Sequence, residues 1–154
     1  MKKTLFFAAL FLTISLTNAQ NFEELANFKF ESAESYKPAE PEVLQAANYL
    51  FENPANVAQV KRLNAVKFIL NWMQGTPDYT FEISNKATEL TKGNPDLLGL
   101  YMAAMTKVVL DNPEKSLSNT EIYNRSEELL VSYCANSENN MKPSRKIKKL
   151  IKNS

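Results

Sequence analysis

Histidine is absent from the 154 residues of this chain, and cysteine and glycine are scarce, with one and three residues. The absence of histidine excludes serine–histidine and cysteine–histidine nucleophile pairs, histidine zinc sites and the commonest general base. Three glycines form neither a phosphate-cradling loop nor a dinucleotide fingerprint. One cysteine cannot complete a cysteine zinc site, and the three aspartates are too scattered for a calcium site. We therefore expect no metal, no cofactor and none of the usual hydrolase machinery.

The lone Cys134 cannot form an internal disulfide, so it is buried, reactive or paired between chains. Burial is the simplest of the three interpretations. The basic and acidic residues number 18 and 17, and this near balance gives no indication of a nucleic-acid partner.

The first residues have the three-part layout of a secretory signal peptide. Lys2 and Lys3 precede an almost entirely apolar run, Leu5 to Leu16, and Ala19 supplies the small residue before the cut. The run is shorter than the roughly 20 residues that a membrane span needs. Gln20 follows the cut, so no cysteine is available for lipidation. Residues 1–19 are predicted to be a cleaved signal peptide, leaving a soluble periplasmic or secreted protein without a transmembrane segment.

Apolar residues recur mostly at spacings of three and four, which together with the few glycines predicts an all-α fold. We expect a compact bundle of five to six helices, with residues 38–141 as the core domain. Helices are expected at Val57 to Gln74 and at Thr120 to Cys134, and the almost wholly apolar Leu97 to Leu110 should be the central one. The stripe expected to face the core in the first of these contains Val60, Leu63, Val66, Ile69, Leu70 and Met73, widened by Phe68 and Trp72.

Three segments allow more than one interpretation. The acidic segment 20–37 could form an amphipathic helix or a strap across the domain. Tyr79, Phe81 and Ile83 alternate with polar residues as in a strand, but Ile83 also has helical spacing with Ala87 and Leu90, and an isolated strand has no partner. Helical hairpins could also stack as repeats. However, the sequence does not fit a 34-residue tetratricopeptide period, so repeat-like packing stays an alternative to the compact bundle.

Asparagine precedes proline at Asn53, Asn94 and Asn112. Asparagine can cap free backbone N–H groups, and proline suits the first turn of a helix, where no N–H partner is needed. Each pair is therefore predicted to lie between two helices.

Charge is distributed unevenly between the two ends. Residues 20–52 contain seven glutamates and two lysines. The predicted C-terminal helix, residues 142–154, has no acidic residue and six cations, namely Lys142, Arg145, Lys146, Lys148, Lys149 and Lys152. A basic amphipathic helix of this kind can bind a polyanion or make weak contact with a membrane surface. The simpler interpretation is that basic residues favour the C-terminal end of a helix and that the tail lies against the acidic N-terminal segment.

One surface is a candidate ligand-binding site, formed by Trp72, Asp78 and Tyr79 around a helix end, with Lys92 and Asn94 from a similar joint that could lie nearby. The simpler interpretation is that both aromatic rings belong to the core. Carboxylates available for acid–base chemistry are Glu82, Glu89, Glu127 and Glu128, although helical glutamates are usually solvated.

A resemblance to known proteins is carried by four segments, namely the end of the signal segment, residues 68–79, Leu90 to Asn94, and Leu97 to Met102. In these segments the chain resembles small exported proteins of Bacteroidota that have no assigned function. This resemblance implies a two-membrane envelope and hence the periplasm, and it carries no catalytic residues. We expect a non-enzymatic envelope protein that binds a protein, peptide or envelope component. The alternatives are a carboxylate enzyme acting on envelope glycans and a protein that attaches to polyanions or membranes through its basic tail.

Overall fold

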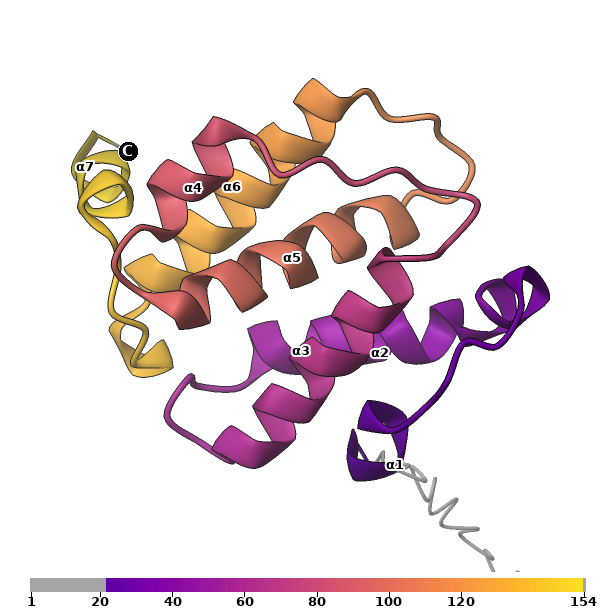
Figure 1. Ribbon diagram of the computed structural model, residues 1–154. Coiled ribbons are helices and arrows are strands. Elements are labelled where there is room, and N and C mark those ends of the chain that lie inside the picture. The colour runs from indigo at the N-terminus through magenta and orange to yellow at the C-terminus, as the bar shows by residue number, and fades with distance from the viewer. Residues whose placement is uncertain (1–21, 154) are drawn as a thin grey trace, which may run out of the picture.

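Helices form nearly all the regular structure between residues 22 and 153, the part of the chain that this computed structural model describes. No strand occurs in that part, which confirms the all-α prediction, and the packing is that of a compact bundle (Figure 1). Residues 22–153 contain seven α-helices, compared with the five to six expected. They are α1 Phe22–Ala26, α2 Glu40–Glu52, α3 Gln59–Met73, α4 Asn85–Thr91, α5 Pro95–Leu110, α6 Asn119–Ala135 and α7 Arg145–Asn153, with single 3-10 turns at Ala33–Ser35, Lys37–Ala39 and Ser137–Asn139. The predicted signal peptide, residues 1–19, lies outside the described residues.

The central helix is α5, as its sequence predicts. It packs against α2, α3, α4 and α6 (Figure 1). Buried residues occur on every side of it, including Leu97, Tyr101 and Thr106, because a helix that is apolar all round gains most when no side faces water. Gly99 allows α3 to come close, since a Cβ at this position would lie 3.0 Å from Cγ1 of Val66.

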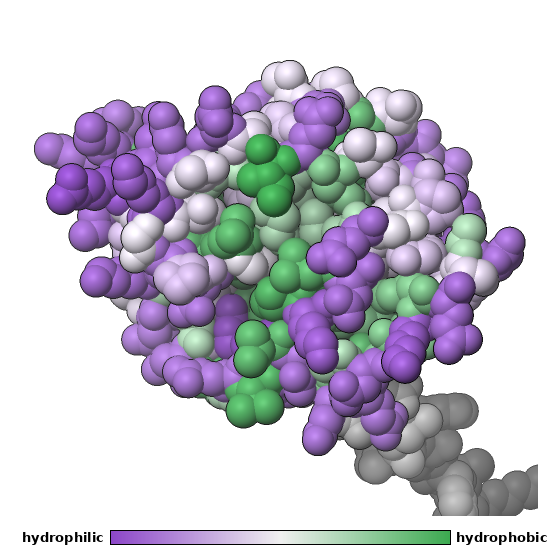
Figure 2. Space-filling view, in the orientation of Figure 1, coloured by the Kyte–Doolittle hydropathy of each residue, from purple (hydrophilic) through white to green (hydrophobic). Residues whose placement is uncertain are grey.

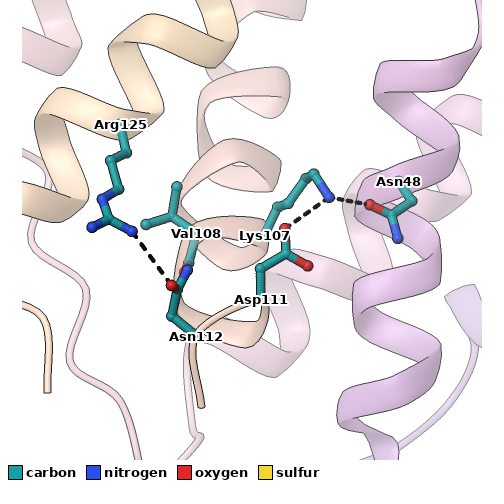
Figure 3. Close-up of polar contacts among 6 residues, drawn as sticks. All are labelled: Asn48, Lys107, Val108, Asp111, Asn112 and Arg125. Carbon is teal, nitrogen blue, oxygen red and sulfur yellow. Dashed lines mark hydrogen bonds and ion pairs between the residues drawn. The ribbon is translucent and has the colours of Figure 1, made fainter. Parts of the chain in front are cut away.

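Polar contacts at the C-terminal end of α5 attach it to α2 and α6 (Figure 3). The Lys107 ammonium donates to Oδ1 of Asn48 on α2 at 2.6 Å and pairs with Asp111 at 2.8 Å. On the other side, Nη1 of Arg125 on α6 donates to Oδ1 of Asn112 at 3.4 Å. A cation near the last turn of a helix also compensates the partial negative charge of its terminal carbonyl groups.

All three asparagine–proline pairs lie between helices, as predicted, but only one asparagine caps the helix that follows. Asn94 accepts a hydrogen bond from the backbone N–H of Asp96, with Pro95 in the first turn of α5. Asn53 and Asn112 instead donate to the carbonyl groups of Tyr49 and Val108, four residues earlier. These two side chains therefore close the helix that precedes them.

The acidic N-terminal segment contains both of the structures considered for it. Residues 22–26 form the short helix α1, and the chain beyond it continues as a strap that returns to α3. The rings of Phe28 and Phe30 lie 6.0 and 5.9 Å from that of Phe68, and Phe30 stacks on Tyr36. The strap therefore covers the side of α3 that carries Phe68.

The predicted inward stripe of α3 is only partly correct. Val60 and Leu63 are 74% and 68% exposed, whereas Ala65, Ile69 and Trp72 are buried. Two apolar stripes overlap on this helix, and the one with the large rings of Phe68 and Trp72 removes more apolar area from water when it turns inward. The face that carries Leu63 is consequently left uncovered.

The segment with alternating residues is neither a strand nor the beginning of a helix. Residues 79–83 run extended without ladder pairing, and α4 begins only at Asn85, where the Ser84 hydroxyl caps the N–H of Ala87. Ile83 therefore lies outside the helix and is 63% exposed, although its spacing from Ala87 and Leu90 suggested a shared face.

Candidate functional site

An apolar groove of about 570 Å³ runs between α3 and α5, and we call it the α3–α5 groove. Figure 2 shows apolar side chains gathered along the middle of this face, over the region where these two helices and the segment before α4 lie in Figure 1. The lining residues are Leu50, Ala55, Gln59, Arg62, Leu63, Val66, Leu70, Ile83, Pro95, Asp96, Leu98, Gly99, Leu100, Met102 and Met141.

The groove exists because two helices expose apolar residues toward the gap between them. Leu63 of α3, Leu98 of α5 and Ile83 of the extended segment line it and are 68%, 41% and 63% exposed. Clustered exposed aliphatic side chains of this kind are unfavourable in water and mark interaction sites. The α3–α5 groove can therefore bind an apolar group by excluding water from these three residues.

Three polar side chains also line the groove, and one of them is buried. Arg62 is 9% exposed, and its Nη1 donates to the carbonyl oxygens of Leu50 at 3.1 Å and Asn53 at 2.9 Å. The Tyr133 hydroxyl donates to the same Asn53 carbonyl at 2.6 Å. Burial raises the pKa of Tyr133, and the neighbouring Arg62 guanidinium partly opposes this shift. The other two polar residues, Gln59 and Asp96, are exposed.

The sequence-predicted site around Trp72 is largely part of the core. Trp72 is fully buried, its Nε1 donates to the Tyr36 carbonyl at 3.3 Å, and its ring lies 5.6 Å from that of Tyr79. Asp78 pairs with Lys37 at 3.6 Å. Asp78 and Tyr79 line a separate hollow of about 450 Å³ near the C-terminal end of α5, and burial is the main cause that raises the pKa of Tyr79.

Lys92 and Asn94 do not join that site. Asn94 caps the N-terminus of α5, whereas Tyr79 lies in a hollow with Val109 near the other end of this 16-residue helix. These ends are about 24 Å apart at 1.5 Å per residue. Nδ2 of Asn94 instead donates to the Lys142 carbonyl at 2.8 Å. The joint expected beside Trp72 therefore lies beside the basic tail.

The cations of that tail lie together at one end of the molecule. Lys92 and the six predicted residues Lys142, Arg145, Lys146, Lys148, Lys149 and Lys152, here called the basic end, are all exposed. None of the seven forms an ion pair with another residue between 22 and 153. The predicted helix begins at Arg145 rather than at residue 142.

The apolar side of α7 faces the protein. It packs on α4 and α6, with Ile147 fully buried and Leu150 and Ile151 half-buried against the core. The tail does not lie against the acidic segment, because α1 packs on α3 and lies on the opposite side of the molecule (Figure 1). The interpretation that the two charged ends meet is therefore wrong for the described residues.

None of the four glutamates considered for acid–base chemistry lines the α3–α5 groove. Glu82 accepts a hydrogen bond from the Tyr123 hydroxyl at 3.4 Å, and Glu127 pairs with Lys86 at 3.2 Å. Glu89 and Glu128 are exposed. Within residues 22–153, no three histidine, cysteine, aspartate or glutamate side chains lie close enough together to hold a metal ion.

The sequence reasoning missed the α3–α5 groove. The sequence carried one signal of it, the width of the apolar stripe on α3. A small core cannot cover the whole of this stripe together with Leu98 and Ile83, so some of these side chains stay exposed. No described helix is long and apolar enough to cross a membrane. Comparison of the chain with protein families, curated proteins and solved structures gives no match.

Proposed function

We propose that this chain is an exported, non-enzymatic binding protein of the bacterial envelope, and that it takes an apolar ligand in the α3–α5 groove. The observation that carries the proposal is the groove itself, about 570 Å³ in volume, with Leu63, Ile83 and Leu98 exposed along it. A volume of roughly 300–1,000 Å³ with mainly apolar lining and a few polar groups is characteristic of small-molecule sites. The predicted signal peptide supports export.

The placement of the carboxylates supports binding more than catalysis. An enzyme working through two carboxylates needs them on opposite sides of the bond that it cleaves. Neither Glu82 nor Glu127 lines the α3–α5 groove, and Asp96 is the single acidic side chain among its lining residues. The groove therefore offers contact area and one acid, which suits retention of a ligand.

The proposal is tested by titration with N-phenyl-1-naphthylamine, an uncharged dye whose fluorescence rises in apolar surroundings. The double variant Leu63→Gln and Ile83→Gln should bind the dye about tenfold more weakly, because partial loss of contact with two aliphatic side chains costs roughly 1.4 kcal/mol or more. Both residues are largely exposed, so the variant should keep the fold.

The matched control is Val60→Gln. Val60 lies on the same helix, is 74% exposed and does not line the groove, so its replacement should leave dye affinity unchanged. Helical content measured by circular dichroism should be the same for all three proteins. Equal dye affinity for the wild type and the double variant, or no binding by the wild type, would remove the groove as the binding site.

A second candidate function, attachment to an anionic surface, is favoured by the basic end. Its seven cations are exposed, and none is paired within the described part of the chain. Since Ile147 is buried in the protein, we expect attachment through charge, without insertion of α7 into lipid.

A further inference from the structure

One end of the α3–α5 groove holds a buried cation. Nη1 of Arg62 lies 3.1 Å from the carbonyl oxygen of Leu50, and Leu50, Ala55 and Arg62 itself all line the groove. The guanidinium therefore lies where the C-terminus of α2 meets the groove. It is always protonated, and the side chain is only 9% exposed.

The charge of Arg62 is only partly balanced. Nη1 donates to the carbonyl oxygens of Leu50 and Asn53, which belong to the last turn and C-cap of α2, where a helix end provides about half an elementary negative charge. No carboxylate between residues 22 and 153 pairs with this guanidinium. Because buried charges are normally paired, a net positive charge at the end of an apolar groove favours an anionic group there.

Resting on the proposed binding function, we propose that the ligand is a small amphiphile with one alkyl or acyl chain and an anionic head. The chain lies along Leu63, Leu98 and Ile83, and the head binds at Arg62. A planar guanidinium suits this role because it binds carboxylate and phosphate oxygens through strong charge-assisted hydrogen bonds.

Asp96 also lines the groove, and its carboxylate would repel such a head. It is exposed, however, and lies in the first turn of α5, where the positive end of the helix dipole offsets its charge. Charges in contact with water interact far more weakly than charges at a buried site. The field of the buried Arg62 therefore dominates at its end of the groove.

A small ligand fits the groove better than a helix of a partner protein. A helix is about 10 Å across with its side chains and rises 5.4 Å per turn, so little more than one turn would fill 570 Å³. The lining residues come from α2, α3, α5 and the segments that precede α3, α4 and α7, so the site is walled on several sides. An alkyl chain of about a dozen carbons can use such a space along its length.

The test compares dodecanoate with dodecanol as displacers of N-phenyl-1-naphthylamine from the wild-type protein at about pH 7.5, where the acid is ionised. The two ligands share a chain and differ in the charge of the head, so no substitution is needed. We expect dodecanoate to bind about tenfold more tightly, as a charge-assisted hydrogen bond to Arg62 predicts. In Arg62→Gln this preference should disappear, while dodecanol affinity should stay within about twofold.

The outcomes separate the two proposals. Equal displacement by acid and alcohol would overturn the anionic head and leave the binding function standing. Displacement by neither, together with failure of the dye to bind, would overturn the binding function itself. If Arg62→Gln does not fold, Arg62→Lys provides the second variant, because it keeps a donor for the α2 carbonyl groups and should weaken dodecanoate more than dodecanol.

Discussion

Cys134 lies on the inner side of α6 and is 8% exposed, which agrees with the simplest of the sequence-based interpretations. Burial raises the pKa of its thiol from an ordinary 9.0 to about 11. The thiolate is the reactive form, so at about pH 8 labelling by a disulfide reagent should be roughly a hundredfold slower in the folded than in the urea-unfolded protein. The rate of chromophore release measures both.

The same shift has a consequence for stability. A thiol whose pKa is higher in the folded than in the unfolded protein stabilises the fold while it is protonated, and this stabilisation is lost as pH rises above the pKa of the unfolded state. Unfolding should therefore become easier between pH 9 and about 11. Cys134→Ser in urea titrations at both pH values is the comparison, and its stability should depend less on pH. Rapid labelling of the folded wild type would show that the thiol is accessible.

Among single residues, Trp72 shows why the sequence-predicted site was incomplete. A tryptophan beside a turn with an acid and a tyrosine has the composition of a binding surface, but also that of a closed helix corner. In the structure Trp72 is completely buried and its Nε1 donates a hydrogen bond to the Tyr36 carbonyl, so this residue closes a helix corner and does not form a binding surface. Tyr36 lies 36 residues earlier, so local sequence around Trp72 could not reveal this partner.

Among the helices, α6 has an N-terminal capping box. The Ser118 hydroxyl accepts from the backbone N–H of Glu121, and the Glu121 carboxylate accepts from the backbone N–H of Ser118 at 2.9 Å. The bonds that the Glu121 carboxylate accepts from the backbone N–H and from the hydroxyl of Ser118 are the main causes that lower the pKa of Glu121. They begin the helix at Asn119, close to the predicted Thr120.

Replacing Ser118 with alanine should therefore destabilise the protein by about 1 kcal/mol, because the backbone N–H of Glu121 loses the Ser118 hydroxyl as its partner. Urea unfolding followed by circular dichroism measures the change. Ser116→Ala is the matched control, since Ser116 is exposed two residues earlier and belongs to no cap. Equal stability of the two variants would show that the capping box contributes nothing.

At the level of the helix, α3 explains why the groove was missed. Periodicity identifies an apolar stripe, but the pattern is the same whether the stripe meets a core, a ligand or solvent. Here the side with Phe68 and Trp72 is covered by the N-terminal strap and the neighbouring helices, and the side with Leu63 is not. The choice depends on segments that come from elsewhere in the chain.

At the scale of the whole molecule, charge is arranged along one direction. The basic end lies with α7 on one side, and the acidic segment with α1 lies on the other (Figure 1). The hydrophilic area at the upper left of Figure 2 lies where α7 is in Figure 1. Such an arrangement can orient the protein at a negatively charged surface although its overall charge is nearly zero.

The basic end predicts co-sedimentation with vesicles rich in phosphatidylglycerol. The triple variant Lys146→Gln, Lys149→Gln and Lys152→Gln should weaken this association about a hundredfold, since each cation near an anionic surface contributes roughly 1 kcal/mol. These side chains are exposed and substitution spares the fold, whereas deletion of the tail would remove the buried Ile147.

The control carries the same change of charge elsewhere, with glutamine at the exposed Lys29, Lys67 and Lys115. It should bind the vesicles as the wild type does. If both triple variants lose binding equally, net charge rather than the basic end determines attachment. Binding by the wild type that resists high salt would contradict an electrostatic contact.

The sequence alone determined the helical class and the order of the main helices, because periodicity, scarce glycine and caps act over a few residues. It also determined that residues 97–110 would be central, since a stretch that is apolar on all sides has no side for water. Tertiary structure decided which side of α3 is covered, where Lys92 and Asn94 lie, and that α7 packs on α4 and α6. Those outcomes depend on contacts between residues that are far apart in the sequence. When several apolar surfaces compete for burial, the arrangement that removes the largest total apolar area from water is favoured.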